Sequence, residues 1–476
     1  MKSYNLPSID VPTQQHCNIA TLTQQLTFQA QQSIHHHSLR DFESMSPSSA
    51  ARVSDRWEEF MGLKDWAGLL DPLDENLSHE ILRYGNFIEA AYRAFDFDPE
   101  SPSYGSCKYK KRSLLQNCGL PNSGYRISRH LRATSGIPVP EWARSSWAAA
   151  QSGWIGYVAV SDNKAVIDRL GRREVVIALR GTATCLEWLE NLRATLTPVS
   201  GPTNLNNANV GPWDRDGPPM VESGFLSLYT SSTDMWPSLQ EAIRKEVSQI
   251  LEEYKNEPLS ITITGHSLGA ALAKIAAYDI KTTFEKAPLV TVISFGGPRV
   301  GNQSFRSLVD RQGTKILRVV NPSDLITKVP GFVSDNGNEE FVNKNTKTSK
   351  KHSKISHKNY YSYNNNSNNN NNNNSNSKLH PLAEFIPNWI TQPFSGMEDK
   401  QWWVYAEVGR ELRLENKETE QLPYYLSNMN VAKCHDLKTY LNLVENCPIK
   451  AFVKRSLNKL SHRCKHKNDD TSILAA

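Results

Sequence analysis

The 476-residue sequence predicts an α/β fold in which helices cover both faces of a mostly parallel central sheet. Short apolar runs rich in β-branched residues alternate with longer segments whose apolar residues recur at helical spacing. The strand-like runs are continuously apolar, which is typical of parallel strands buried on both faces. The predicted strands are residues 174–179, 259–264, 289–295 and 315–320, and the predicted helices between them are 234–255 and 268–285.

The first 150 residues differ in texture from this alternating region. Residues 1–50 are rich in Gln, Ser, Thr and His, and their first forty positions hold a single acidic residue, Asp10. They contain no apolar core of a secretory signal, and the composition fits an organellar transit peptide or a plain disordered tail. Residues 51–150 are expected to form a helical N-terminal extension, because apolar residues recur at helical spacing over 57–66 and 79–96.

Low-complexity sequence interrupts the C-terminal third of the chain. Residues 364–376 consist of 11 Asn and 2 Ser, and a lysine-rich run precedes them. Such a tract cannot bury enough apolar surface to offset the entropy of ordering, so we expect residues 341–378 to be a disordered surface insert. A strand is predicted over 404–414, and residues 456–476 are expected to be a basic disordered tail. The folded domain should therefore span 51–455.

Composition excludes several classes of protein. Residues 341–380 contain seven lysines and no acidic residue, so they contribute more positive charge than the net +5 of the whole chain. The rest of the chain is therefore slightly acidic and predicts no nucleic-acid groove. No run of eighteen apolar residues occurs, which excludes a membrane-spanning helix. The seven cysteines include no CxxC pair, which argues against a disulfide scaffold or a structural zinc site and suits a reducing compartment.

The motif Gly265-His266-Ser267-Leu268-Gly269 joins a predicted strand to a predicted helix. A nucleophilic serine in such a turn crowds its neighbours, and glycines two residues before and after it relieve the clash. The helix that follows points its N-terminus at developing negative charge. We therefore expect Ser267 to be a catalytic nucleophile and His266 to pack within the elbow. The alternative is a glycine-rich turn with an idle serine.

A serine in this context takes its acid and its histidine from later in the chain, in that order. Asp324 follows the predicted strand 315–320 in a turn, where such an acid is expected. Its alternative role is to satisfy the backbone of that turn after Pro322. Asp335 is the second candidate for the acid.

His435 is the expected general base. A base needs a fixed orientation, and the other histidines after Asp324 lie in or beside the low-complexity insert or in the basic tail. His435 instead precedes a segment with apolar residues at helical spacing, and its alternative role is to cap that helix.

Two backbone N–H groups are expected to bind the oxyanion that forms during acyl transfer. One belongs to Leu268, the residue after the nucleophile. The other is expected from Thr182, which follows Gly181 in a loop after the predicted strand 174–179. The Thr182 hydroxyl could donate as well, and the glycine allows the backbone to approach closely.

Together these motifs resemble the class 3 (Rhizomucor-type) lipases, and within them the plant phospholipase A1 branch that includes plastid galactolipases. The resemblance covers roughly residues 55–455, in blocks that follow the order of the family. The blocks are IALRGTATCLEWLENL at 177–192, VESGFLSLY at 221–229, ITGHSLGAALA at 263–273, VISFGGPRVGN at 292–302, RVVNPSDLITKVPG at 318–331, VGRELRL at 408–414 and CHDLKTYL at 434–441.

The resemblance implies an α/β-hydrolase fold with Ser267, Asp324 and His435 as the triad and with Leu268 and Thr182 in the oxyanion hole. It also implies a plastid address, which favours the transit-peptide interpretation, with a cytoplasmic location as the alternative. By position, residues 193–221 resemble the lid of such enzymes, and their Pro- and Gly-rich composition fits an ordinary surface excursion equally.

The implied activity is release of the fatty acid at the sn-1 position of phospholipids or galactolipids, at a lipid surface. A triacylglycerol lipase is the alternative enzyme, and a non-catalytic lipase-like regulatory protein is the alternative from another class. The two-step acyl transfer requires no metal and no organic cofactor. The sequence predicts no nucleic-acid partner and does not define an oligomeric state.

Overall fold

The computed structural model describes residues 47–98, 100–134, 152–182, 195–199, 217–330, 405–414 and 431–447. All of them belong to one compact unit, Met1–Gly331 with Gly396–Ala476, and the second unit, Phe332–Ser395, lies outside the described residues. The insert expected at 341–378 and the tail expected at 456–476 also lie outside them. The first helix begins at Pro47, so the boundary expected at residue 50 falls inside a helix.

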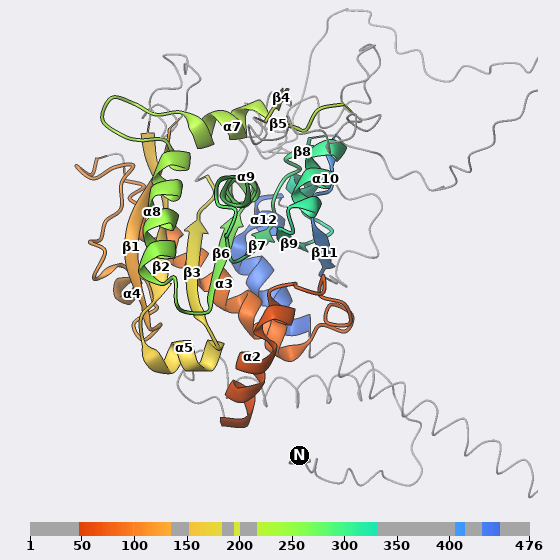
Figure 1. Cartoon of the computed structure of the whole chain (residues 1–476). Coiled ribbons are helices and arrows are strands. Elements are labelled where there is room, and N and C mark those ends of the chain that lie inside the picture. Colours follow the sequence, from red (N-terminus) through yellow and green to blue (C-terminus); the bar gives the residue numbers. More distant parts are fainter. Residues whose placement is uncertain are drawn as a thin grey trace, which may run out of the picture. The chain divides into compact units, whose positions relative to one another are not determined.

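The central sheet confirms the predicted fold class (Figure 1). Its strands lie in the order β1-β2-β3-β6-β7-β9-β11, and every neighbouring pair from β3 to β11 is parallel. Strand β2 is antiparallel to both of its neighbours, β1 and β3. The strands are β1 (Tyr125–Thr134), β2 (Ser152–Ser161), β3 (Arg173–Leu179), β6 (Leu259–His266), β7 (Leu289–Phe295), β9 (Lys315–Val320) and β11 (Arg410–Arg413).

Strand β1 corrects part of the expectation for residues 51–150. That region was expected to be helical, and β1 instead pairs with β2 over its whole length, at the edge of the sheet. The sequence of β1 places an arginine at every third position, which hides the alternation expected of a strand. Two of these arginines, Arg126 and Arg129, form ion pairs with Glu253 and Glu246 of helix α8 (Leu239–Glu253).

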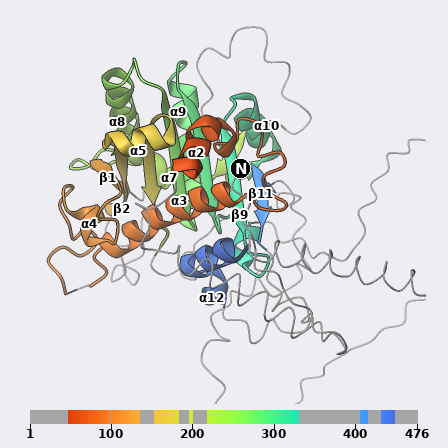
Figure 2. The ribbon, with the colours of Figure 1, turned by 90° about the horizontal axis from the view of Figure 1, so that it is seen from below.

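Helices cover both faces of the sheet. Figures 1 and 2 show α8 and α9 (Leu268–Thr283) on one face and α3 (Glu75–Ala94) on the other. Successive residues of a strand point to opposite faces, so Val175 and Ile177 of β3 join the core under α8 and α9, whereas Val176 joins the core under α3. Apolar burial on both faces explains the continuous apolar runs in the sequence.

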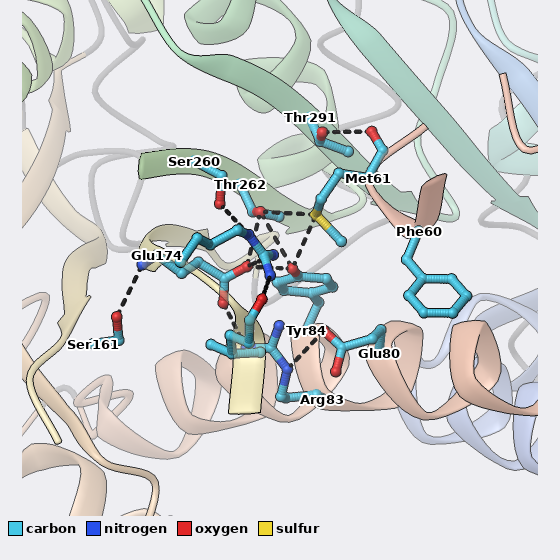
Figure 3. A network of polar contacts seen from close by, with 12 residues as sticks. Phe60, Met61, Glu80, Arg83, Tyr84, Ser161, Glu174, Ser260, Thr262 and Thr291 are labelled. Atoms are coloured by element: carbon cyan, nitrogen blue, oxygen red, sulfur yellow. Dashed lines mark hydrogen bonds and ion pairs between the residues drawn. The ribbon is translucent and has the colours of Figure 1, made fainter. Parts of the chain in front are cut away.

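Helix α3 is anchored to the sheet by charge as well as by apolar packing. The helix begins after Asp74, whose side chain accepts hydrogen bonds from two backbone N–H groups of its first turn. Arg83 of α3 donates to Glu174 of β3 over 2.7 Å, and Arg172 donates to the other carboxylate oxygen of Glu174 over 2.7 Å (Figure 3). Tyr84 and Tyr125 also donate to this carboxylate.

Burial alone would raise the pKa of Glu174, but the two guanidinium groups hold it well below its usual value. The buried carboxylate is therefore ionised and fully hydrogen-bonded. It lies at the start of β3, at the opposite end of the strand from Leu179.

A second, small sheet has the order β10-β8-β5-β4. Strand β4 lies near the start of residues 193–221, the candidate lid, and β5 lies at their end. The two strands pair antiparallel, with Leu196 opposite Glu222. Residues 200–216 lie outside the described part of the chain. The strands of this sheet are β4 (Leu196–Pro198), β5 (Met220–Glu222), β8 (Gly301–Asn302) and β10 (Tyr405–Ala406).

Two predicted elements differ from the structure. Helix α2 (Pro47–Phe60) ends before Trp66, because the chain turns at Gly62, whose φ is +86°, and turns again at Asp65 and Trp66, which have left-handed backbone angles. The strand predicted over 404–414 is two strands in different sheets, β10 and β11. Between them the chain bends at Gly409, whose φ is +108°.

The remaining helices are short. They are α4 (Leu114–Asn117), α5 (Lys164–Leu170), α7 (Ser223–Thr230), α10 (Gln303–Arg311), η4 (Leu325–Lys328) and α12 (Val431–His435), and residues 437–447 are also helical. Among the helices of the described residues, none is long and apolar enough to cross a membrane.

Candidate active site

Ser267 lies at the tight turn between β6 and α9. Its φ of +57° is one of three positive values among the described residues other than glycine, and its side chain is buried. A Cβ on Gly265 would lie 2.3 Å from the Gly269 carbonyl oxygen, and a Cβ on Gly269 would lie 2.3 Å from the Leu179 carbonyl oxygen. The GxSxG motif therefore has a steric cause, and the strained serine is held at the carboxyl end of a central strand.

Asp324 lies in the turn after β9, at the start of the short helix η4, and is fully buried. Its Oδ1 accepts a hydrogen bond from the Ile326 backbone N–H over 2.9 Å. Its Oδ2 accepts from His435 Nδ1 over 2.7 Å and from the Tyr440 hydroxyl over 2.6 Å. Three donors thus fix the carboxylate, and one of them is the predicted base.

His435 ends helix α12 and is 3% exposed. Because its Nδ1 donates to Asp324, Nε2 is the ring nitrogen that can take a proton in the neutral imidazole. Its ring lies beside the elbow, with a centroid distance of 4.7 Å to the ring of His266, the residue before Ser267. Asn321 donates to the carbonyl of Cys434 over 2.9 Å and so also holds this segment.

Two other aspartates that follow Ser267 in the sequence contact different side chains, away from the Asp324–His435 pair. Asp279 binds Arg244 and Tyr229 on the α8 side of the sheet, and Asp310 lies near Arg306 on the surface. Asp335 lies outside the described residues, as do the five other histidines that follow Asp324 in the sequence.

The two expected oxyanion donors lie on either side of the nucleophile. Leu268 is the first residue of α9. The loop that carries Thr182 approaches so closely that a Cβ on Gly181 would lie 2.8 Å from the Ser267 Cβ. Thr182 is 6% exposed, and its buried hydroxyl has no hydrogen-bond partner within the described part of the chain. A buried hydroxyl in this position can donate to a bound oxyanion.

Arg180 fixes the peptide that leads into Thr182. Its guanidinium donates to the Gly181 carbonyl over 2.7 Å and twice to the Trp154 carbonyl. Burial lowers the pKa of Arg180 to about 10, so the group remains charged at neutral pH. In a trans peptide the N–H points opposite to the C=O, so the bond to Gly181 also sets the direction of the Thr182 N–H.

Two tyrosines of this site were not singled out from the sequence. Tyr440 lies in the helical segment 437–447 and orients Asp324. Tyr92 lies in α3, and its hydroxyl is 2.8 Å from His266 Nδ1 and 2.8 Å from the Gly181 nitrogen. Each tyrosine sits at an apolar position of an amphipathic helix, so the pattern alone indicates a core residue.

A strained serine elbow, a buried carboxylate–imidazole pair beside it and a close donor loop define a serine hydrolase of the α/β-hydrolase class. The family model "Lipase (class 3)" matches residues 176–334. The chain belongs to the class 3 lipase family, and it is a carboxylic ester hydrolase.

Its relatives include two chloroplast proteins of Arabidopsis thaliana. It is 51% identical to phospholipase A(1) DAD1, chloroplastic, over 429 residues, which cover 88% of this chain and 84% of the relative. It is 40% identical to galactolipase DONGLE, chloroplastic, over 299 residues, which cover 60% of this chain and 61% of the relative. A solved Rhizomucor miehei lipase propeptide complex is 18% identical, with a TM-score of 0.34 over 54% of this chain and 63% of that one.

Proposed function

We propose that the protein hydrolyses the sn-1 acyl ester of membrane glycerolipids, both phospholipids and galactolipids, and that Ser267, Asp324 and His435 are its catalytic triad. The observation that carries the proposal is the 2.7 Å contact between the buried Asp324 and His435, made beside the serine elbow. The phospholipase A1 and galactolipase names of the relatives support this class of substrate.

In the first step, His435 Nε2 takes the proton of Ser267 as Oγ attacks the ester carbonyl carbon. Asp324 keeps the proton of the imidazole on Nδ1 and stabilises the imidazolium that forms. The N–H groups of Thr182 and Leu268, with the Thr182 hydroxyl, bind the oxyanion. His435 then protonates the lysolipid as it leaves, and the acyl group remains on Ser267.

In the second step, water attacks the acyl-enzyme while His435 accepts a proton from it. The same donors bind the second oxyanion, and its collapse releases the fatty acid and restores the serine. His435 returns each proton that it takes up, first to the leaving lysolipid and then to Ser267. The residues named here therefore complete the catalytic cycle.

A plastid location suits this activity, because the relatives with these activities are named chloroplastic. We propose that the protein acts at the surface of plastid membranes, with its transit peptide within residues 1–50 and ending before helix α2.

The proposal is tested with phosphatidylcholine and monogalactosyldiacylglycerol that carry different acyl labels at sn-1 and sn-2. We expect release of the sn-1 label from both lipids by the wild-type protein and none by the Ser267→Ala variant, which should retain the fold. Ser227→Ala, at a half-buried serine of helix α7, is the matched control and should keep full activity.

Each other outcome has a defined meaning. Release of the sn-2 label alone contradicts the positional assignment. Hydrolysis of neither lipid, together with hydrolysis of a triacylglycerol assayed in parallel, supports the neutral-lipid alternative. Absence of hydrolysis together with absence of labelling by a fluorophosphonate probe supports the non-catalytic alternative.

A further inference from the structure

Three hydrogen bonds link the separate parts of the active site through Tyr92 and His266. The Gly181 N–H lies 2.8 Å from the Tyr92 hydroxyl, and that hydroxyl lies 2.8 Å from His266 Nδ1. His266 Nε2 in turn lies 2.7 Å from the His435 carbonyl oxygen. The chain of bonds therefore begins in the oxyanion loop, passes through the elbow and ends on the backbone of the expected base.

The direction of all three bonds follows from the groups themselves. A carbonyl oxygen only accepts, so His266 Nε2 carries a proton and donates it to His435. Burial, together with the neighbouring His435 ring, holds the pKa of His266 well below its usual value, so the ring is neutral and Nδ1 accepts. Tyr92 must then donate to Nδ1, which leaves its oxygen to accept from Gly181.

Each bond constrains a part of the site that acts on the substrate. The first holds Gly181, the residue before Thr182, by its N–H, while Arg180 holds Gly181 by its carbonyl. The third bond holds the His435 carbonyl, and Asn321 holds the carbonyl of the preceding residue, Cys434. Because His266 immediately precedes Ser267, the elbow is joined to both.

We propose that Tyr92 and His266 are positioning residues, which set the distance between the oxyanion loop and the His435 backbone on either side of Ser267. The proposal rests on the proposed function, since positioning matters only if this site performs acyl transfer. It also gives helix α3 a direct part in the activity, because α3 supplies Tyr92 from outside the segment matched by the family model.

The Tyr92→Phe variant tests this with little change in volume. Loss of the hydroxyl leaves Gly181 N–H without its acceptor and removes the donor that fixes the His266 tautomer. We expect kcat for p-nitrophenyl butyrate to fall about tenfold with KM within about twofold, because misplaced catalytic groups affect the transition state rather than ground-state binding.

Tyr157→Phe is the matched control. Tyr157 is fully buried, whereas Tyr92 is half-buried, and the Tyr157 hydroxyl donates over 2.7 Å to the Phe87 carbonyl of the helix that carries Tyr92, α3. Each variant loses one hydroxyl that is hydrogen-bonded within the fold, so we expect the decrease in the midpoint of thermal unfolding to be no larger for Tyr92→Phe than for Tyr157→Phe. A role in stability alone predicts equal kcat values for the two variants.

Substitutions at His266 provide a second, independent comparison. The side-chain amide of His266→Gln can still donate toward the His435 carbonyl, whereas His266→Leu cannot. We expect kcat of the glutamine variant within about threefold of wild type and a loss of at least about tenfold in the leucine variant. If the leucine variant fails to fold, the comparison of kcat between Tyr92→Phe and Tyr157→Phe tests the positioning role.

The tautomer itself is measurable by NMR on full-length protein labelled with ¹⁵N-histidine, with the His266 signals identified by their absence from the glutamine variant. We expect a protonated Nε2 and a bare Nδ1 in wild type, and a mixture of tautomers in Tyr92→Phe. A protonated Nδ1 in the wild-type protein would overturn the proposal.

The two proposals fail in different ways. If the wild-type protein neither turns over esters nor reacts with a fluorophosphonate, the proposed function is wrong. If the wild-type protein is active and Tyr92→Phe matches Tyr157→Phe in kcat, the positioning role is wrong and the proposed function stands.

Discussion

His435 Nδ1 lies 2.7 Å from Asp324 Oδ2, although 111 residues separate them in the chain. One strand within this long connection brings the chain back toward Asp324. Asp324 follows β9, and β11, which lies between Asp324 and His435 in the sequence, pairs with β9 in parallel from Arg410 to Arg413. Because the chain returns to the sheet beside β9 before it reaches His435, the long segment between the two strands adds only a logarithmic entropic cost to closing the site.

Replacing Asp324 with Asn should separate geometry from charge. With its oxygen in the place of Oδ1 the amide still accepts from the Ile326 N–H, but the NH2 group in the place of Oδ2 cannot accept from His435 or Tyr440 and favours the wrong imidazole tautomer. We expect kcat to fall by about 10⁴-fold with the fold retained, as for the carboxylate of other serine triads. Steady-state kinetics and circular dichroism check this, and activity within tenfold of wild type would exclude Asp324 as the acid.

Replacing Thr182 with Val removes a hydroxyl and keeps both the shape and the backbone N–H. Since the hydroxyl is buried without a partner in the described residues, its expected use is in binding the oxyanion. We expect kcat to fall by about 10²-fold with KM little changed. Thr182→Ser keeps the hydroxyl and should retain most of the activity, so equal kcat values for the two variants would refute this role.

Replacing Glu174 with Gln should affect stability and not chemistry. The change removes the carboxylate that binds the buried Arg172 and leaves Arg83 with Glu80 as its acidic partner, and we expect a loss of about 3 kcal/mol in the free energy of unfolding. Urea unfolding measures it, and kcat per fluorophosphonate-titrated site should stay within about twofold of wild type.

Glu257→Gln is the control for this prediction, because the pair between Arg173 and Glu257 is largely exposed on the glutamate side. We expect this variant to lose less than about 1 kcal/mol. Equal losses in the two variants would show that the buried network stabilises the fold no more than a surface pair does.

The low pKa of His266 predicts a dependence of stability on pH. The folded protein keeps the ring neutral, whereas the unfolded chain takes up a proton as the pH falls through about 6.5. Above that pH this group does not change the free energy of unfolding. Below it, proton uptake by the unfolded chain lowers the free energy of unfolding by about 1.4 kcal/mol per pH unit, until the folded-state pKa is reached.

His266→Gln removes this proton uptake and should leave the other titrating groups unchanged. Between about pH 7.5 and about pH 5.5, its free energy of unfolding should fall by about 1.4 kcal/mol less than that of wild type. Urea unfolding at the two pH values measures the difference, and identical losses would mean that His266 is protonated in the folded state as readily as in the unfolded one.

The sequence predicts the elements whose cause is local. Strand β6, the turn at Ser267 and helix α9 follow from apolar runs and from glycines that a Cβ would obstruct. Asp324 could be predicted as the acid because it lies in a turn after a central strand. His435 could be predicted as the base by elimination among the histidines. The structure brings these two side chains together, and their catalytic roles remain predictions.

The features that the sequence could not predict depend on tertiary contacts. Tyr92 and Tyr440 look like ordinary core aromatics until the fold shows what their hydroxyls touch. The arginines of β1 suggest a helix, and only pairing with β2 and with the acidic residues of α8 makes that segment a strand. The bend at Gly409 likewise becomes evident only when β10 and β11 join different sheets.

The most direct test of the account is a crystal structure of the full chain after reaction with an alkyl fluorophosphonate. We predict phosphorus bound to Ser267 Oγ, with the phosphoryl oxygen within about 3 Å of the Thr182 and Leu268 nitrogens and His435 Nε2 facing Oγ. An adduct on any other residue, or a phosphoryl oxygen directed away from both nitrogens, would contradict the account.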